Sequence, residues 1–93
     1  MTLSVTGALT FASVPEWRRQ GRRFIAQDAA PQFDFAEVQQ SDSSGVALLL
    51  AWLRDAKAAE KNVLFINLPQ QLLDVASVCG VLFLLEQVSK KNG

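Results

Sequence analysis

Residues 41–54 have the sequence Ser41-Asp-Ser-Ser-Gly-Val-Ala-Leu-Leu-Leu-Ala-Trp-Leu-Arg54, in which a polar start leads into the longest apolar, helix-favouring segment of the chain. The apolar residues recur with the i, i+3, i+4, i+7 spacing of one buried helical stripe: Val46, Leu49, Leu50 and Leu53. Ser or Asp before such a run is a usual helix start, because the side-chain oxygen accepts a hydrogen bond from a free backbone N–H. The pattern predicts a helix over residues 43–61 with a polar, hydroxyl-bearing tip.

Segments typical of strands and of helices alternate on both sides of this helix. Residues 2–6 and 33–38 alternate apolar with polar residues, and residues 63–66 form the continuous apolar run of a strand buried on both faces. Further helices are expected from Ser13, where Ser-x-x-Glu fits a capping box, and over residues 70–78. Residues 81–88 fit a strand or a last helix, and we favour a short helix. The alternation predicts a single α/β domain over residues 1–93, with a small, mainly parallel or mixed sheet packed against helices.

Composition restricts the function of the chain. Nine basic and nine acidic residues cancel, which argues against nucleic acid as the main partner. The chain has no His and no Tyr, so neither a Ser–His nor a Cys–His nucleophilic pair can form, and one Cys without His gives no set of zinc ligands. We therefore expect no catalytic residue, no metal and no cofactor.

Other features of the sequence bear on its location. The single cysteine, Cys79, cannot form an internal disulfide, which fits a reducing cytoplasm, and we expect it to be a small buried residue near a helix end. No stretch approaches the ~18 apolar residues of a membrane span. The N-terminus shows no basic segment followed by an apolar one, so no signal peptide is expected.

The polar tip also carries a family resemblance. Asp42-Ser43-Ser44-Gly45 followed by Val-Ala-Leu-Leu-Leu resembles the Asp-Ser/Thr-x-Gly helix start of the STAS family, the sulphate transporter and anti-sigma-factor antagonist domains. Gly-x-Leu-Thr at 7–10, Asp-Phe-Ala-Glu-Val at 34–38 and Asn-Leu-Pro at 67–69 resemble further stretches of the family. Within it, the chain is most similar to the small STAS subunit of bacterial Mla phospholipid transport complexes. The resemblance implies a STAS-like fold whose N-terminal edge strand is missing or short.

The resemblance implies a partner-binding site at the helix tip. In anti-sigma-factor antagonists the Ser or Thr directly after the Asp is phosphorylated, and Ser43 matches that position. In the Mla-type subunit the same position lies at the contact with the ATPase subunit. Ser43 is thus the expected centre of an interface, with Asp42, Ser44 and Gly45 shaping the tip. From the residues alone, a simple helix cap worth ~1 kcal/mol explains the same polar run.

Two further sets of residues are candidates for partner contacts, and for each set a role without any partner is the alternative. Leu48 and Trp52 lie off the apolar stripe and are candidate apolar anchors, while burial of Trp52 under a neighbouring element fits equally well. A run of arginines on the first helix is either a solvated face or a basic docking patch for an acidic partner or lipid headgroups: Arg18, Arg19, Arg22 and Arg23.

The expected function is that of a non-enzymatic accessory subunit. It would bind and stabilise or regulate the ATPase subunit of a phospholipid ABC transporter that maintains outer-membrane lipid asymmetry, in the cytoplasm against the inner-membrane complex. The alternative is an anti-sigma-factor antagonist that an anti-sigma factor kinase switches by phosphorylation at Ser43. Nucleotide binding is a weaker hypothesis, because residues 42–45 have neither the Lys nor the spacing of a P-loop.

Overall fold

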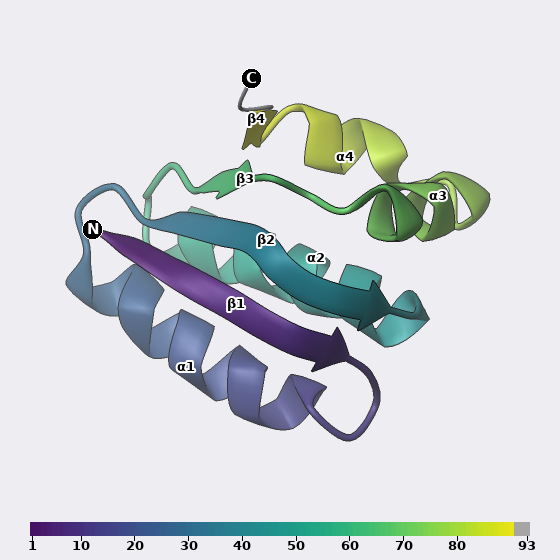
Figure 1. Ribbon diagram of the computed structural model, residues 1–93. Coiled ribbons are helices and arrows are strands. Elements are labelled where there is room, and N and C mark those ends of the chain that lie inside the picture. The colour runs from purple at the N-terminus through teal and green to yellow at the C-terminus, as the bar shows by residue number, and fades with distance from the viewer. Residues whose placement is uncertain (91–93) are drawn as a thin grey trace.

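The computed structural model describes residues 1–90, in which a four-stranded sheet is packed against helices (Figure 1). Each strand pairs in parallel with the next one along the chain: β1 (Thr2–Leu9), β2 (Gln32–Ser41), β3 (Leu64–Ile66) and β4 (Ser89–Lys90). The predicted α/β fold with a mainly parallel sheet is thus confirmed, and every described strand pair is parallel. Among these strands β1 lies at one edge and pairs only with β2.

Helical connections link the strands, as parallel pairing requires. They are α1 (Val14–Gln27), α2 (Ser43–Ala58), α3 (Gln70–Val78) and α4 (Leu82–Glu86). Figure 1 shows α1 and α2 side by side along one face of the sheet, with α3 and α4 beside the β3–β4 side. On β1, Val5 and Leu9 are buried in the core, whereas Thr2, Ser4 and Thr6 are exposed, so the opposite face of this strand is polar.

The core is built around aromatic side chains from the sheet and from α2. Trp52 of α2 stacks on Phe33 of β2, with ring centroids 4.4 Å apart. Phe65 of β3 packs edge-on against Phe33 and against Phe35, with ring centroids 5.7 and 5.5 Å apart, respectively. Such stacked and edge-to-face pairs add to the stability that burial of the rings already gives. These contacts pack α2 against β2 and join β3 to the same aromatic cluster.

The helix α3 matches the sequence prediction over residues 70–78, whereas β1 and β2 each run three residues beyond their predicted ends at residues 6 and 38. The predicted end of α2 at residue 61 is wrong, because the helix stops at Ala58. Glu60 takes a left-handed φ of 57°, and the Lys61 N–H bonds back to the Ala56 carbonyl, which closes the helix in a Schellman motif. Residues 81–88 contain the favoured short helix, α4, and lead into β4, a two-residue strand that the sequence analysis missed.

Two local expectations are wrong. The capping box at Ser13 does not form: its hydroxyl donates to the Ala8 carbonyl at 2.7 Å and accepts from the Thr10 N–H at 3.0 Å, while Glu16 pairs with Arg19. Ser13 therefore closes the turn between β1 and α1.

Cys79 is exposed rather than buried, because it follows the last turn of α3 at the surface.

Candidate functional site

The carboxyl ends of β1 and β2 place the tip of α2 beside the loop that precedes α1. Leu9 pairs with Ser41 at the ends of the two strands, and the Asp42 N–H donates to the Leu9 carbonyl at 3.2 Å. The Ser41 N–H donates to Oε1 of Gln71 on α3 at 3.1 Å. Figure 1 shows the β1–α1 and β2–α2 connections at the same end of the sheet. In parallel α/β sheets, binding sites gather at this carboxyl end.

The tip is an ordered helix start with an exposed hydroxyl. Asp42 is the N-cap of α2, and its carboxylate accepts a hydrogen bond from the Ser44 N–H at 2.7 Å. Ser43 is the first residue of the helix and is exposed, while Ser44 is partly buried. The first turn of a helix carries N–H groups without helical partners and the positive end of the helix dipole. Ser43 is therefore exposed at a capped helix start.

Gly45 shapes the tip from inside. It is buried, and a Cβ at this position would overlap Oγ of Ser41 and lie 3.2 Å from Cβ of Leu9. Ser41 is itself buried and donates from its hydroxyl to the Asp42 carbonyl at 3.2 Å. Gly45 thus allows the first turn of α2 to pack closely on the two strand ends, and a partner would not contact it.

Leu48 and Trp52 are not exposed anchors, and the alternative that Trp52 is buried under a neighbouring element is confirmed. Their exposed fractions are 1% and 0%, and both belong to the hydrophobic core. Trp52 lies between the sheet and α1, where its Nε1–H points at the Arg18 carbonyl 3.5 Å away. A helix that is apolar nearly all round is buried on several sides, and α2 packs against both α1 and α3.

An exposed aromatic residue that the sequence analysis missed lies in the loop beside the tip. Phe11 follows the end of β1 by two residues and is 85% exposed. Its neighbour in sequence, Thr10, is held by Ser13, so the loop has a defined turn. Phe11 belongs to no periodic apolar pattern of the sequence. The only sequence signal for its exposure is that it lies in a loop and not in an apolar run. Phe11 takes the place of Leu48 and Trp52 as the candidate apolar contact.

The arginines of α1 do not form one patch. Arg18 is tied to Asp55 of α2 by two hydrogen bonds of 3.2 Å, and Arg22 lies on the same side. Arg19 and Arg23 lie on the other side, toward β1. The hydrogen bond from Arg19 is the main cause that lowers the pKa of Glu16, and the charge of Arg23 adds to it. The basic surface is therefore divided between two faces of the helix.

Two general findings restrict what the described residues can do. Among residues 1–90, no group of three or more His, Cys, Asp or Glu side chains is arranged to hold a metal ion. The same residues contain no helix of the length and apolar character that crossing a membrane requires.

Comparison with known proteins assigns the family. The family described as "Mlab, STAS domain" matches residues 1–86. The chain belongs to the STAS family. The STAS membership expected from residues 42–45 is thus confirmed, and the domain is of the Mlab type. A search of curated proteins finds no match.

Solved structures share the fold of this STAS domain. The anti-sigma factor antagonist SpoIIAA in its unphosphorylated form is similar with a TM-score of 0.75 and 20% identity, covering 99% of this chain and 78% of that one. The phosphorylated form of SpoIIAA, a Bacillus cell fate determinant, is similar with a TM-score of 0.72 and 21% identity. The match covers 99% of this chain and 81% of that one. The STAS domain of a SulP transporter from Vibrio cholerae is similar with a TM-score of 0.67 and 16% identity, covering 98% of this chain and 71% of that one. These likenesses establish the fold alone.

Family membership indicates the kind of function. STAS domains are generally non-enzymatic modules that bind or regulate other proteins. The exposed tip of α2 and the loop that carries Phe11 form a surface suited to that role.

Proposed function

We propose that this STAS domain is an accessory subunit that binds the ATPase subunit of a phospholipid ABC transporter and stabilises or regulates it. The contact surface is the tip formed by Asp42, Ser43 and Ser44 together with Phe11, which we call the α2 tip surface. The observation that carries the proposal is the exposed Ser43, held at the first turn of α2 in a chain whose family match is of the Mlab type. The ATPase partner places the domain in the cytoplasm, against the inner-membrane complex.

The hydrogen bonds, the packing and the chemistry of this surface support the proposal. Asp42 caps the helix, Gly45 packs on the strand ends, and Gln71 of α3 holds Ser41. Binding to a preorganised surface loses little conformational entropy. An exposed aromatic side chain beside polar groups is a frequent arrangement at protein interfaces.

A pull-down from the native membrane fraction tests the proposal. The wild-type domain is expected to recover an ABC ATPase, and Ser43→Asp is expected to lose most of it, because a carboxylate adds charge and bulk at the centre of the contact. Ser77→Asp is the matched control, since Ser77 is an exposed serine on α3. Equal recovery by all three proteins would contradict the assignment of the site, and absence of any ATPase would contradict the function.

The alternative function is an anti-sigma-factor antagonist controlled at Ser43. The exposure of the Ser43 hydroxyl at a helix N-terminus favours it, because the helix dipole stabilises a phosphate there, while Asp42 beside it repels the added charge. Labelling of Ser43 by a co-purifying kinase, with no ATPase recovered, would support this alternative.

A further inference from the structure

Gln71, in the first turn of α3, completes the hydrogen bonding at the end of β2. The strand β3 ends with Ile66, opposite Asp34, whereas β2 continues to Ser41. On one side Ser41 pairs with Leu9 of β1. On the other side its N–H donates to Oε1 of Gln71 at 3.1 Å. The side chain of Gln71 thus supplies the acceptor that β3 is too short to provide.

This hydrogen bond determines how the amide group of Gln71 is turned. A backbone N–H requires an acceptor, and the only acceptor in a glutamine side chain is its carbonyl oxygen. The oxygen therefore faces Ser41, and the two donors on Nε2 are directed elsewhere. Gln71 is exposed, and its Nε2 forms no hydrogen bond within the part of the chain that the structure describes. Nε2 is therefore a free donor on a side chain that is already held in place.

The amide of Gln71 lies beside the α2 tip surface. Ser41, its hydrogen-bond partner, directly precedes Asp42, the N-cap of α2, and Ser43 follows. Figure 1 shows α3 at the same end of the sheet as the start of α2. A side chain that is fixed before binding loses less conformational entropy when a partner docks. Gln71 is therefore better prepared for a specific contact than a freely rotating surface residue.

We propose that Gln71 is a specificity-determining residue of the α2 tip surface, whose Nε2 donates a hydrogen bond to a carbonyl oxygen of the ATPase subunit. This inference rests on the proposed function and adds the chemistry of one contact to it. A neutral acceptor fits better than a carboxylate, because the exposed carboxylate of Asp42 would repel a second negative charge. Without this donor, the partner's carbonyl would be buried with no hydrogen bond, which reduces affinity.

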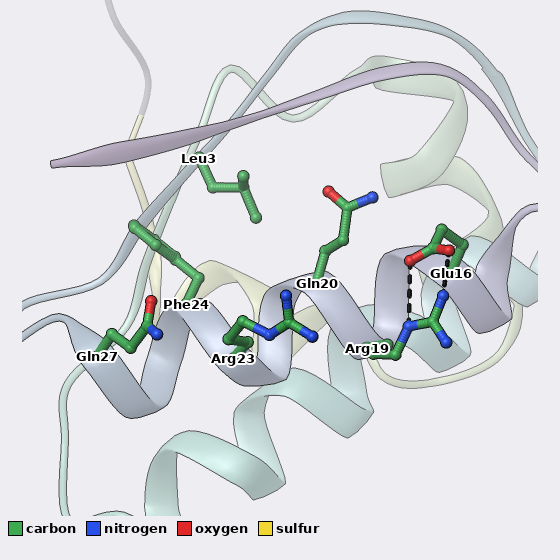
Figure 2. A pocket seen from close by; sticks show the side chains of 7 residues that line it. All are labelled: Leu3, Glu16, Arg19, Gln20, Arg23, Phe24 and Gln27. Atoms are coloured by element: carbon green, nitrogen blue, oxygen red, sulfur yellow. Dashed lines mark hydrogen bonds and ion pairs between the residues drawn. The ribbon is translucent and has the colours of Figure 1, made fainter.

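Two substitutions separate the donor of this amide from its acceptor. Gln71→Glu keeps an oxygen that accepts from the Ser41 N–H but removes the donor, whereas Gln71→Met removes both at a similar length. Gln70→Glu is the matched control, because it adds the same charge in the same helical turn, and Nε2 of Gln70 already donates to Asp74 at 2.8 Å. Gln20→Glu is the distant control, since Gln20 points from α1 toward β1 (Figure 2).

The measurement uses the full chain, immobilised at increasing amounts, and the ABC ATPase that it recovers from native membranes. We expect Gln71→Glu to weaken this recovery about ten-fold, while NMR-detected hydrogen exchange of the Ser41 amide stays slow. Gln71→Met is expected to weaken recovery and also to accelerate that exchange, because the acceptor is lost. Both controls are expected to change recovery by less than about two-fold. Urea unfolding confirms that each variant is folded.

Three results would overturn the proposal. Unchanged recovery by Gln71→Glu would show that the donor is dispensable. An equal loss in Gln70→Glu or Gln20→Glu would show a general effect of charge. Fast exchange of the Ser41 amide in Gln71→Glu would show that the loss arises from a disturbed end of β2. If the wild type recovered no ATPase at all, the proposed function itself would be contradicted, and the contact with it.

Discussion

At the scale of single residues, Trp52 connects the two large helices with the sheet. It stacks on Phe33 of β2 and approaches the Arg18 carbonyl of α1, while Gly21 of α1 lies against its indole ring. Only a glycine leaves room there, because a Cβ at position 21 would overlap the ring. The close approach of α1 and α2 thus depends on one glycine facing one tryptophan.

This contact predicts that Gly21→Ala destabilises the domain. In an exposed helix position the same change would stabilise by about 1 kcal/mol, but overlap with Trp52 is expected to produce a net loss of about 1–3 kcal/mol. Urea unfolding measures the difference. In a Trp52→Leu background the loss is expected to shrink, since the two residues are in contact. A neutral or stabilising effect of Gly21→Ala in the wild-type background would contradict the packing.

Phe11 gives a second prediction at this scale, one that belongs to the proposed function. Replacing the ring by a serine side chain removes an exposed apolar contact, so Phe11→Ser is expected to reduce ATPase binding by about ten-fold while leaving the urea midpoint nearly unchanged. The matched control is Phe83→Ser on α4, where the ring is 57% exposed. If Phe83→Ser reduced ATPase binding as much as Phe11→Ser, the assignment of Phe11 to the interface would be wrong.

At the scale of elements, helix ends are stabilised by residues from neighbouring segments. Lys61, just after α2, donates from Nζ to the Ile25 carbonyl at 2.6 Å and to the Ala26 carbonyl at 2.9 Å, in the last turn of α1. The last turn of α1 has no basic residue of its own. Lys61 therefore supplies both hydrogen bonds and positive charge at the negative end of that helix dipole.

Lys61→Met is expected to cost about 1 kcal/mol of unfolding free energy, because it keeps the alkyl chain but leaves these carbonyls without their charged donor. Urea unfolding of the variant measures the loss. Lys57→Met provides the control, as Lys57 is exposed on α2. An equal loss in the control would show a general charge effect instead of a specific helix cap.

The elements also show what the sequence could and could not predict. α3 was predicted correctly because Pro69 and Gly80 mark its two ends. The sequence leaves the burial of Trp52 open and does not indicate that of Leu48, since the i, i+3, i+4, i+7 spacing describes one apolar stripe and α2 is covered on several sides. The strand β4 was missed because two residues carry no periodic signal, and its pairing depends on β3.

At the scale of the whole molecule, the carboxyl ends of the parallel strands bring residues far apart in sequence to one surface. The tip at Ser43 could be predicted from the sequence, because its Asp-Ser-Ser-Gly pattern lies within one short segment. The addition of Phe11 required the fold, since only the pairing of Leu9 with Ser41 places that loop beside the tip. The division of the arginines likewise depends on how α1 packs between α2 and β1.

Site-directed cross-linking tests the central claim most directly. Cys79→Ser gives a chain without cysteine, into which Ser43→Cys or Ser77→Cys introduces a single site for a benzophenone label. Irradiation in native membranes is expected to join the label at position 43 to an ABC ATPase subunit and to give little or no such product from position 77. An ATPase cross-link from position 77 but not from position 43 would contradict the claim that the tip of α2 is the binding surface.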